Sequence, residues 1–147
     1  EALRRQSVEN AFCTVGLGTL EPLEGGGFEA CLAAGGHPFP LLVRAGGNVE
    51  EVVVRGTLLG VEAEPVIEPA QVTLAPGDTL VLYTDDVVDA RDQSGERFGE
   101  ERLLAAVDGA AGGSAEEVAG AVDEAVAAFE PDRQRDDRAI FVMRVSD

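Results

Sequence analysis

The sequence is poor in cysteine, in aromatic residues and in positive charge. Its 147 residues include two cysteines, no tryptophan and only 5% aromatic residues, and acidic residues outnumber basic ones 28 to 11. The net charge of −17 repels the phosphates of nucleic acids and the surface of anionic membranes, so we expect neither as a partner. No apolar run is long enough to cross a bilayer, and no signal peptide is visible. We therefore expect a cytoplasmic protein that does not insert into a membrane.

The remaining composition is that of one globular domain, which we place at residues 1–147. Hydrophobic residues make up 45% of the chain, which argues against disorder. Cys13 and Cys31 lie in apolar runs and do not form a C-x-x-C pair, so we expect two buried, reduced thiols rather than a disulfide. Residues 1–6 resemble the end of a helix, which predicts that the N-terminal part of the domain is missing.

Turn residues divide the first half of the chain into short apolar segments. This pattern predicts strands, the first four arranged as two hairpins, at 12–20, 28–34, 41–45, 49–54, 72–74 and 79–84. Beyond them the apolar period changes to that of a helix, over 100–107 and again after Ser114, whose spacing to Glu117 is that of a capping box. A last apolar run at 139–145 predicts a strand. Hairpins followed by two helices and a strand indicate an antiparallel α+β domain.

Paired aspartates stand beside two of the predicted strands. Asp85 and Asp86 follow the strand at 79–84, and Asp136 and Asp137 precede the strand at 139–145. Adjacent carboxylates repel each other and resist desolvation, and a hard cation removes both costs. The pattern therefore indicates a carboxylate-lined metal site, and solvated acids at strand ends are the alternative interpretation.

Other chemically interesting residues have simpler interpretations. The only histidine, His37, lies in a loop of glycines and prolines without a G-x-S-x-G elbow, so we favour a structural role over catalysis. Asp89 and Asp92 are interpreted as solvated loop acids, because the spacing of their segment is not that of an EF-hand.

Three arginines flank the second aspartate pair. Arg133, Arg135 and Arg138 either meet a substrate phosphate or belong to a solvated linker, and we favour the linker because charge runs are usually solvated.

Several short motifs follow one another in the order found in a known family. They are Phe12-Cys13-Thr14-Val15, Gly35-Gly36-His37-Pro38-Phe39-Pro40-Leu41-Leu42, Leu58-Leu59-Gly60, Leu74-Ala75-Pro76-Gly77-Asp78, Leu82-Tyr83-Thr84-Asp85, Phe98-Gly99-Glu100-Glu101-Arg102-Leu103 and Asp136-Asp137-Arg138-Ala139. The ordered set resembles the metal-dependent protein phosphatases of type 2C, in the bacterial branch of the sporulation stage II E phosphatase and the sigma-factor-regulating phosphatases. The resemblance implies a β-sandwich of antiparallel sheets flanked by antiparallel helices.

The resemblance also implies an activity and a site. In this family two Mn²⁺ or Mg²⁺ ions share a water that attacks phosphoserine or phosphothreonine. On the matching positions Asp85 and Asp136 are the expected catalytic metal ligands, and Asp137 orients the site or holds outer-sphere water. The implied substrate is the phosphoserine form of an anti-sigma-factor antagonist, in bacterial stress or developmental signalling.

Two departures from the family pattern bear on activity. The first ligand motif, an aspartate followed by a glycine-rich turn, is absent, so we expect this chain alone to be weakly active or inactive. The sheet edge left open would allow a homodimer. Asp86 stands where the family usually has glycine, and it either binds a further ion or crowds a backbone that needs glycine. The alternatives to an enzyme are a catalytically inactive regulatory or interaction module and a calcium-stabilised binding domain.

Overall fold

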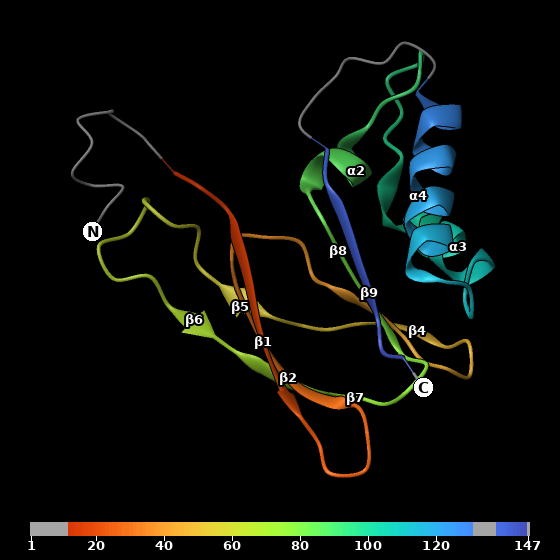
Figure 1. Cartoon of the computed structure of the whole chain (residues 1–147). Helices are drawn as coiled ribbons and strands as arrows, with labels where there is room; N and C mark the ends of the chain where they lie inside the picture. Colours follow the sequence, from red (N-terminus) through yellow and green to blue (C-terminus); the bar gives the residue numbers. More distant parts are fainter. Residues whose placement is uncertain (1–11, 131–137, 147) are drawn as a thin grey trace.

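The computed structural model describes residues 12–130 and 138–146, and this part of the chain forms three layers (Figure 1). The first layer is a sheet in the order β1 (Val15–Pro22), β2 (Phe28–Gly35) and β7 (Ala70–Leu74). The second is a sheet in the order β4 (Val49–Glu51), β3 (Leu41–Val43), β8 (Thr79–Tyr83) and β9 (Ile140–Arg144). Helices α3 (Gly99–Gly109) and α4 (Ala115–Phe129) cover the far face of the second sheet.

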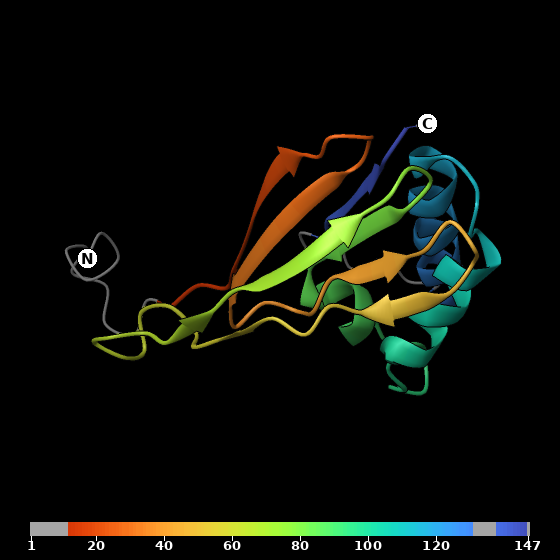
Figure 2. The same cartoon turned by 90° about the horizontal axis from the view of Figure 1, so that it is seen from below.

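Every strand pair in these sheets is antiparallel, which confirms the predicted α+β class. Both predicted hairpins are present, with Val15 opposite Gly35 in the first and Leu41 opposite Glu51 in the second. Two small strands, β5 (Arg55–Gly56) and β6 (Ile67–Glu68), pair beyond them and were not predicted. Figures 1 and 2 show that this β5–β6 pair reaches away from the helices.

Strand β8 lies between two hydrophobic cores. Val81 and Tyr83 point toward the helices with Leu41 and Val43, whereas Leu80 points toward the first sheet. Four of its five residues are buried, because both faces of the strand are covered. A continuous apolar run rather than an alternating one is the expected sequence for such a strand. The structure therefore confirms the prediction of a buried strand at 79–84.

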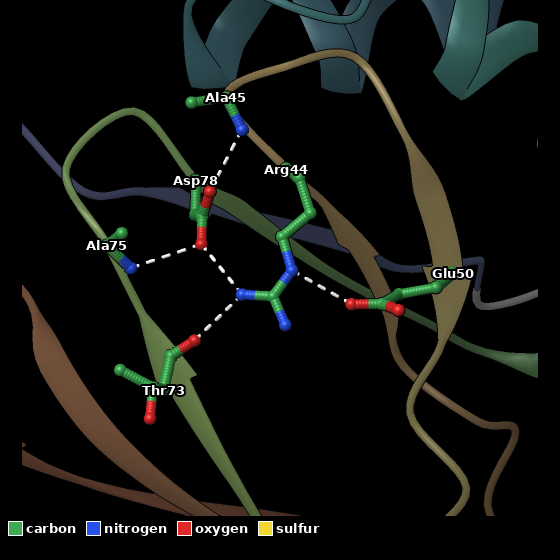
Figure 3. Close-up of polar contacts among 6 residues, drawn as sticks. All are labelled: Arg44, Ala45, Glu50, Thr73, Ala75 and Asp78. Carbon is green, nitrogen blue, oxygen red and sulfur yellow. Dashed lines mark hydrogen bonds and ion pairs between the residues drawn. The ribbon is translucent and has the colours of Figure 1, made fainter.

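The turn before β8 is fastened by a buried carboxylate (Figure 3). Asp78 is 3% exposed and accepts hydrogen bonds from the backbone N–H groups of Ala45 (2.9 Å) and Ala75 (3.1 Å) and from Arg44 Nη1 (2.9 Å). Arg44 also donates to Glu50 and to the carbonyl oxygen of Thr73. Burial raises the pKa of Asp78, but these three hydrogen bonds and the charge of Arg44 together lower it below its usual value. Asp78 therefore joins the β3–β4 turn to the beginning of β8.

The two long helices pack on each other, and α4 also packs on β9. The predicted capping box of α4 is present, because Ser114 accepts from the N–H of Glu117 and Glu117 accepts from the N–H of Ser114. Phe98, directly before α3, meets Phe129 at the end of α4 edge to face, with ring centroids 5.6 Å apart.

A short helix, α2 (Asp85–Asp89), follows β8 at once and was not predicted. The bounds of the other predicted elements agree to within a few residues, and the proposed helix end at residues 1–6 lies outside the described residues.

Within the described ranges, none of the helices has the length and apolar character needed to cross a membrane. Cys13 and Cys31 are free thiols as predicted, but they are half-buried rather than buried.

Candidate functional site

A cleft of about 320 Å³ lies at the C-terminal end of β8, beside the predicted metal ligand Asp85. It is bounded by the β2–β3 loop, the end of β4, the junction of β8 and α2, and the beginning of α3. The residues that line it are Gly36, His37, Pro38, Phe39, Glu51, Tyr83, Asp85, Val88 and Glu100. The cleft therefore combines Asp85 with two further carboxylates from distant parts of the sequence.

Asp85 occupies the first position of α2 and is exposed at the cleft. Within residues 12–130 and 138–146, no group donates a hydrogen bond to its carboxylate. The helix is held in place by Val87 and Val88, which are buried in the core between the second sheet and the helices. The core thus fixes the backbone at Asp85, while the described residues leave its carboxylate oxygens open.

Asp86 is the second residue of α2 and is half-buried. Its backbone is that of a right-handed helix, which any L-amino acid adopts without strain. The observed conformation at Asp86 therefore does not require glycine.

The residue before Asp85 connects β8 to the beginning of β9. The backbone N–H of Thr84 donates to the carbonyl oxygen of Ala139 at 3.0 Å, and the N–H of Ala139 donates to Oγ1 of Thr84 at 3.0 Å. Ala139 is two residues beyond Asp137. These two hydrogen bonds therefore join Thr84, the residue before Asp85 and Asp86, to Ala139, two residues after Asp137 in the sequence.

The electrostatic character of the cleft is negative. Tyr83 is 5% exposed, and burial followed by the charges of Glu100 and Glu51 raises the pKa of its hydroxyl to about 12. Tyr83 is therefore protonated and neutral at neutral pH. No arginine or lysine is among the residues that line the cleft, so its charged groups in the described part of the chain are carboxylates.

The cleft is suited to a hard cation, but the described residues do not complete a metal site. Glu51, Asp85 and Glu100 offer the oxygen ligands that Mn²⁺ and Mg²⁺ prefer. Within the described ranges, however, no group of three or more His, Cys, Asp or Glu side chains is arranged to hold a metal ion. Asp136 and Asp137, the other predicted ligands, lie outside the described residues.

His37 lies on the wall of the cleft formed by the β2–β3 loop. Its Nδ1 is 3.4 Å from the hydroxyl of Thr14, and its ring packs so close to Gly16 that a Cβ there would be 3.1 Å from Cδ2. These contacts fasten the loop to β1, which agrees with the structural interpretation of this histidine.

The charged residues around the site have more partners than the sequence indicated. Arg138 is half-buried and donates to Glu130 at 3.3 Å, so it is not part of a solvated linker, while Arg133 and Arg135 lie outside the described residues. Asp89 pairs with Arg97, and Asp92 accepts from Ser94 and from the N–H of Glu96. Hydrogen bonding, first of all to the Ser94 side chain, lowers the pKa of Asp92. Both aspartates therefore organise the turn between α2 and α3.

Sequence reasoning missed Glu51, Glu100 and Tyr83 as residues of the cleft. Glu51 is one of two adjacent glutamates in a hairpin strand, and Glu100 is one of two in the first turn of α3, where acidic residues are common for helix stability alone. The sequence contains no local signal that distinguishes these glutamates from their neighbours, because only the fold brings them to Asp85.

Comparison with known proteins supports the same fold and extends over the whole chain. The family model for stage II sporulation protein E (SpoIIE) matches residues 1–146. The phosphatase domain of the cell fate determinant SpoIIE from Bacillus subtilis is 18% identical, with a TM-score of 0.70 over 99% of this chain and 61% of that chain. No curated protein sequence matches.

Two further solved structures are similar. The SiaA-PP2C domain of Pseudomonas aeruginosa is 26% identical, with a TM-score of 0.65 over 82% of this chain and 51% of that chain. The RsbU and RsbW domains of a Mycobacterium tuberculosis protein are 21% identical, with a TM-score of 0.65 over 91% of this chain and 37% of that chain. The chain thus spans between about a third and three fifths of the solved chains to which it is similar. The match of the family model over nearly every residue, on a fold of the same kind, shows that this chain belongs to the SpoIIE family of PP2C-type phosphatase domains.

Proposed function

We propose that this chain carries the catalytic cleft of a metal-dependent protein serine/threonine phosphatase, within a single domain over residues 1–147. The observation that carries the proposal is the wall formed by Glu51, Asp85 and Glu100, with no arginine or lysine among the lining residues. A phosphate dianion is repelled by three carboxylates unless cations lie between them. A cleft of this composition in a phosphatase family therefore fits a reaction that uses bound cations.

Asp85 and Asp136 are the proposed metal ligands. Ala139 is hydrogen-bonded to Thr84, the neighbour of Asp85. Asp136 precedes Ala139 by three residues, so a chain of normal geometry keeps its Cα within about 11 Å of that of Ala139. Both aspartates can then serve one site, with Asp137 orienting it or holding outer-sphere water and Asp86 available to a further ion.

The chemistry divides between the ions and the protein. Two Mn²⁺ or Mg²⁺ ions, when bound, supply an activated water and neutralise charge on the phosphoryl oxygens. The carboxylate of Asp85, at the beginning of α2 just beyond the buried strand β8, would hold them, while Glu51 and Glu100 would attract cations into the cleft. Tyr83 stays protonated and adds no charge, and Phe39 and Val88 provide apolar surface in the cleft.

The proposed substrate is a phosphoserine protein of the anti-sigma-factor-antagonist type, acted on in the cytoplasm. The similarity to a protein that contains RsbU and RsbW domains supports this choice. A homodimer also stays a prediction. Strand β1 is exposed along its whole length and is the edge strand of its sheet, which leaves it free to pair with a second copy.

The test is hydrolysis of a phosphoserine peptide by the full-length protein with and without Mn²⁺. We expect Mn²⁺-dependent release of phosphate, and a loss of at least about a hundredfold in kcat for Asp85→Asn and for Asp136→Asn, since even outer-shell changes cost up to that much. Asp108→Asn is the matched control, because Asp108 is exposed near the end of α3, away from the cleft.

The Asp86→Gly variant distinguishes the hypothesis of an enzyme from that of a catalytically inactive module. Turnover that appears only in Asp86→Gly means that the fold is a phosphatase silenced at this residue. If neither the wild type nor Asp86→Gly shows turnover, the catalytic assignment is wrong and an interaction module is the remaining hypothesis. Tight binding of Ca²⁺ but not Mn²⁺ would instead support a calcium-stabilised binding domain.

A further inference from the structure

The hydroxyl of Tyr83 lacks a hydrogen-bond partner in the described part of the chain, although its ring is buried. Tyr83 is 5% exposed, and its side chain belongs to the core between the second sheet and the helices. Within residues 12–130 and 138–146, no group forms a hydrogen bond with this hydroxyl. A buried tyrosine hydroxyl usually has such a partner, because leaving it unpaired costs free energy. The hydroxyl of Tyr83 is therefore available to a ligand.

This hydroxyl opens to the cleft beside Asp85. Tyr83 is one of the residues that line the cleft. Among the described residues, the only fully buried side-chain nitrogen or oxygen without a partner is Nη1 of Arg138, so the unpartnered oxygen of Tyr83 is not sealed in the core. After burial itself, the charges of Glu100 and Glu51 raise the pKa of this hydroxyl, and both glutamates line the same cleft. The small exposed part of Tyr83 therefore includes its polar end.

The polar groups around this hydroxyl suit a cation with several N–H donors better than a bare metal ion. Glu51 ends β4 and Glu100 lies in the first turn of α3. In the described ranges, neither belongs to a group of three or more His, Cys, Asp or Glu side chains arranged to hold a metal ion. A neutral phenol oxygen is also not among the ligands that Mg²⁺ and Mn²⁺ prefer. A guanidinium has five N–H donors in a planar fork, so it can donate to two carboxylates and a hydroxyl together.

The rest of the cleft fits the remainder of an arginine side chain. Pro38, Phe39 and Val88 provide apolar walls, and the volume of about 320 Å³ is sufficient for a small ligand. The methylene stem of arginine packs on apolar surface, and its planar head is attracted to the face of an aromatic ring. The net charge of −17 also attracts basic segments of other proteins.

We propose that Glu51, Tyr83 and Glu100 form a subsite for an arginine side chain of a protein partner. The guanidinium donates to both carboxylates and to the hydroxyl oxygen of Tyr83, which gives that buried group its partner. This inference deepens the proposed function and rests on it for the identity of the partner, which is then a phosphoprotein substrate with an arginine near its phosphoserine. The subsite itself requires no metal ion and does not involve Asp136.

The experiment measures peptide binding to the full-length protein by calorimetry, without metal ions or phosphate. The probe is an acetylated glycine–arginine–glycine amide, and its matched control contains citrulline, which has the shape of arginine without the charge. We expect the arginine peptide to bind at least about tenfold more tightly than the citrulline peptide, because the charge-assisted hydrogen bonds require the guanidinium.

Three substitutions in the protein test the residues of the subsite. Tyr83→Phe, Glu51→Gln and Glu100→Gln should each weaken binding of the arginine peptide by about tenfold, since each removes a hydrogen bond to a charged group or the charge itself. Glu101→Gln is the matched control, because Glu101 is the exposed neighbour of Glu100 in the first turn of α3 but does not line the cleft. It should keep the affinity of the wild type.

Equal binding of the arginine and citrulline peptides would overturn the inference, and so would wild-type affinity in a folded Tyr83→Phe protein. An equal loss in Glu101→Gln would overturn it as well, because it would mean a general effect of charge. If Tyr83→Phe does not fold, Glu51→Gln and Glu100→Gln, which change exposed side chains, are judged by the same criterion.

Titration with Mn²⁺ alone distinguishes the subsite from a metal site. If Glu51→Gln and Glu100→Gln weaken Mn²⁺ binding but not binding of the arginine peptide, the two glutamates serve the ion and the inference is wrong. The proposed function is checked separately, by Mn²⁺-dependent hydrolysis and its loss in Asp85→Asn. Because peptide binding is measured without metal or phosphate, a failure of the catalytic assignment and a failure of the arginine subsite give different results.

Discussion

Strand β8 has an aspartate just beyond each end, and the two carboxylates are in opposite situations. Asp78 is 3% exposed and accepts hydrogen bonds from two backbone N–H groups and from Arg44. Asp85 is exposed beside other carboxylates and, in the part of the chain that the structure describes, accepts none. A carboxylate whose lone pairs are used by the protein contributes to the fold, whereas one whose lone pairs are left open is available to a ligand.

The largest expected contrast is in stability. Asp78→Ala should lower the free energy of unfolding by about 2–4 kcal/mol, because the N–H groups of Ala45 and Ala75 and the guanidinium of Arg44 lose their acceptor. Asp85→Ala removes an exposed side chain and should change the same quantity by no more than about 0.5 kcal/mol. Urea unfolding of both variants measures the difference. Equal losses in the two proteins would mean that Asp85 is structural as well.

The dependence of stability on acid pH should include a contribution from Asp78, the one buried carboxylate among those whose pKa is lowered in the described part of the chain. Hydrogen bonding lowers its pKa in the folded protein, so the unfolded chain binds the proton more readily. The stabilisation is therefore complete above the pKa of the unfolded chain, near 3.9, and is lost as the pH falls from about 5 through the lower, folded pKa. Asp78→Asn should flatten this dependence. Unfolding midpoints measured between neutral and acid pH test it, and an unchanged slope in Asp78→Asn would contradict the assignment.

A smaller expected effect is a change in the pKa of Tyr83, which responds to the carboxylates at the C-terminal end of β8. Tyr83 is the only tyrosine of the chain, so tyrosinate absorbance follows it without interference. Its folded pKa of about 12 lies above the usual value of about 10, so the neutral ring stabilises the fold below pH 10 and this contribution is lost between about pH 10 and 12.

Glu100→Gln removes one of the charges that raise this pKa. The midpoint of the alkaline titration should fall but remain above the usual value, because burial of Tyr83 is the larger cause. A midpoint that does not move in Glu100→Gln would mean that the carboxylate does not face the ring. Glu116→Gln, in the first turn of α4, is a control that should leave the midpoint unchanged.

The sequence allowed the strands and the long helices to be predicted because their signals are local. The run at 79–84 and the capping box of Ser114 each contain enough information within a few residues. The position of Asp85 at the end of a buried strand was predicted for the same reason.

The remaining features depend on contacts between distant residues. Helix α2 has five residues, fewer than two turns, so it shows no helical period, and its valines favour strands in isolation. Arg44 and Asp78 are 34 residues apart, and their bond exists only once the β3–β4 hairpin lies against the turn before β8. Glu51 and Glu100 likewise join Asp85 only through the fold. The ligand pair itself, Asp85 with Asp136, stays a prediction.

The position of β8 between the two cores has a consequence for motion. Because its side chains belong to both cores, its amides can exchange with solvent only when both layers open, which amounts to unfolding of the domain. Strand β1, exposed along its length, can instead separate locally. We therefore expect Asp85 to be attached to a part of the molecule that opens slowly, and the geometry of its cleft to persist while the edge of the first sheet opens.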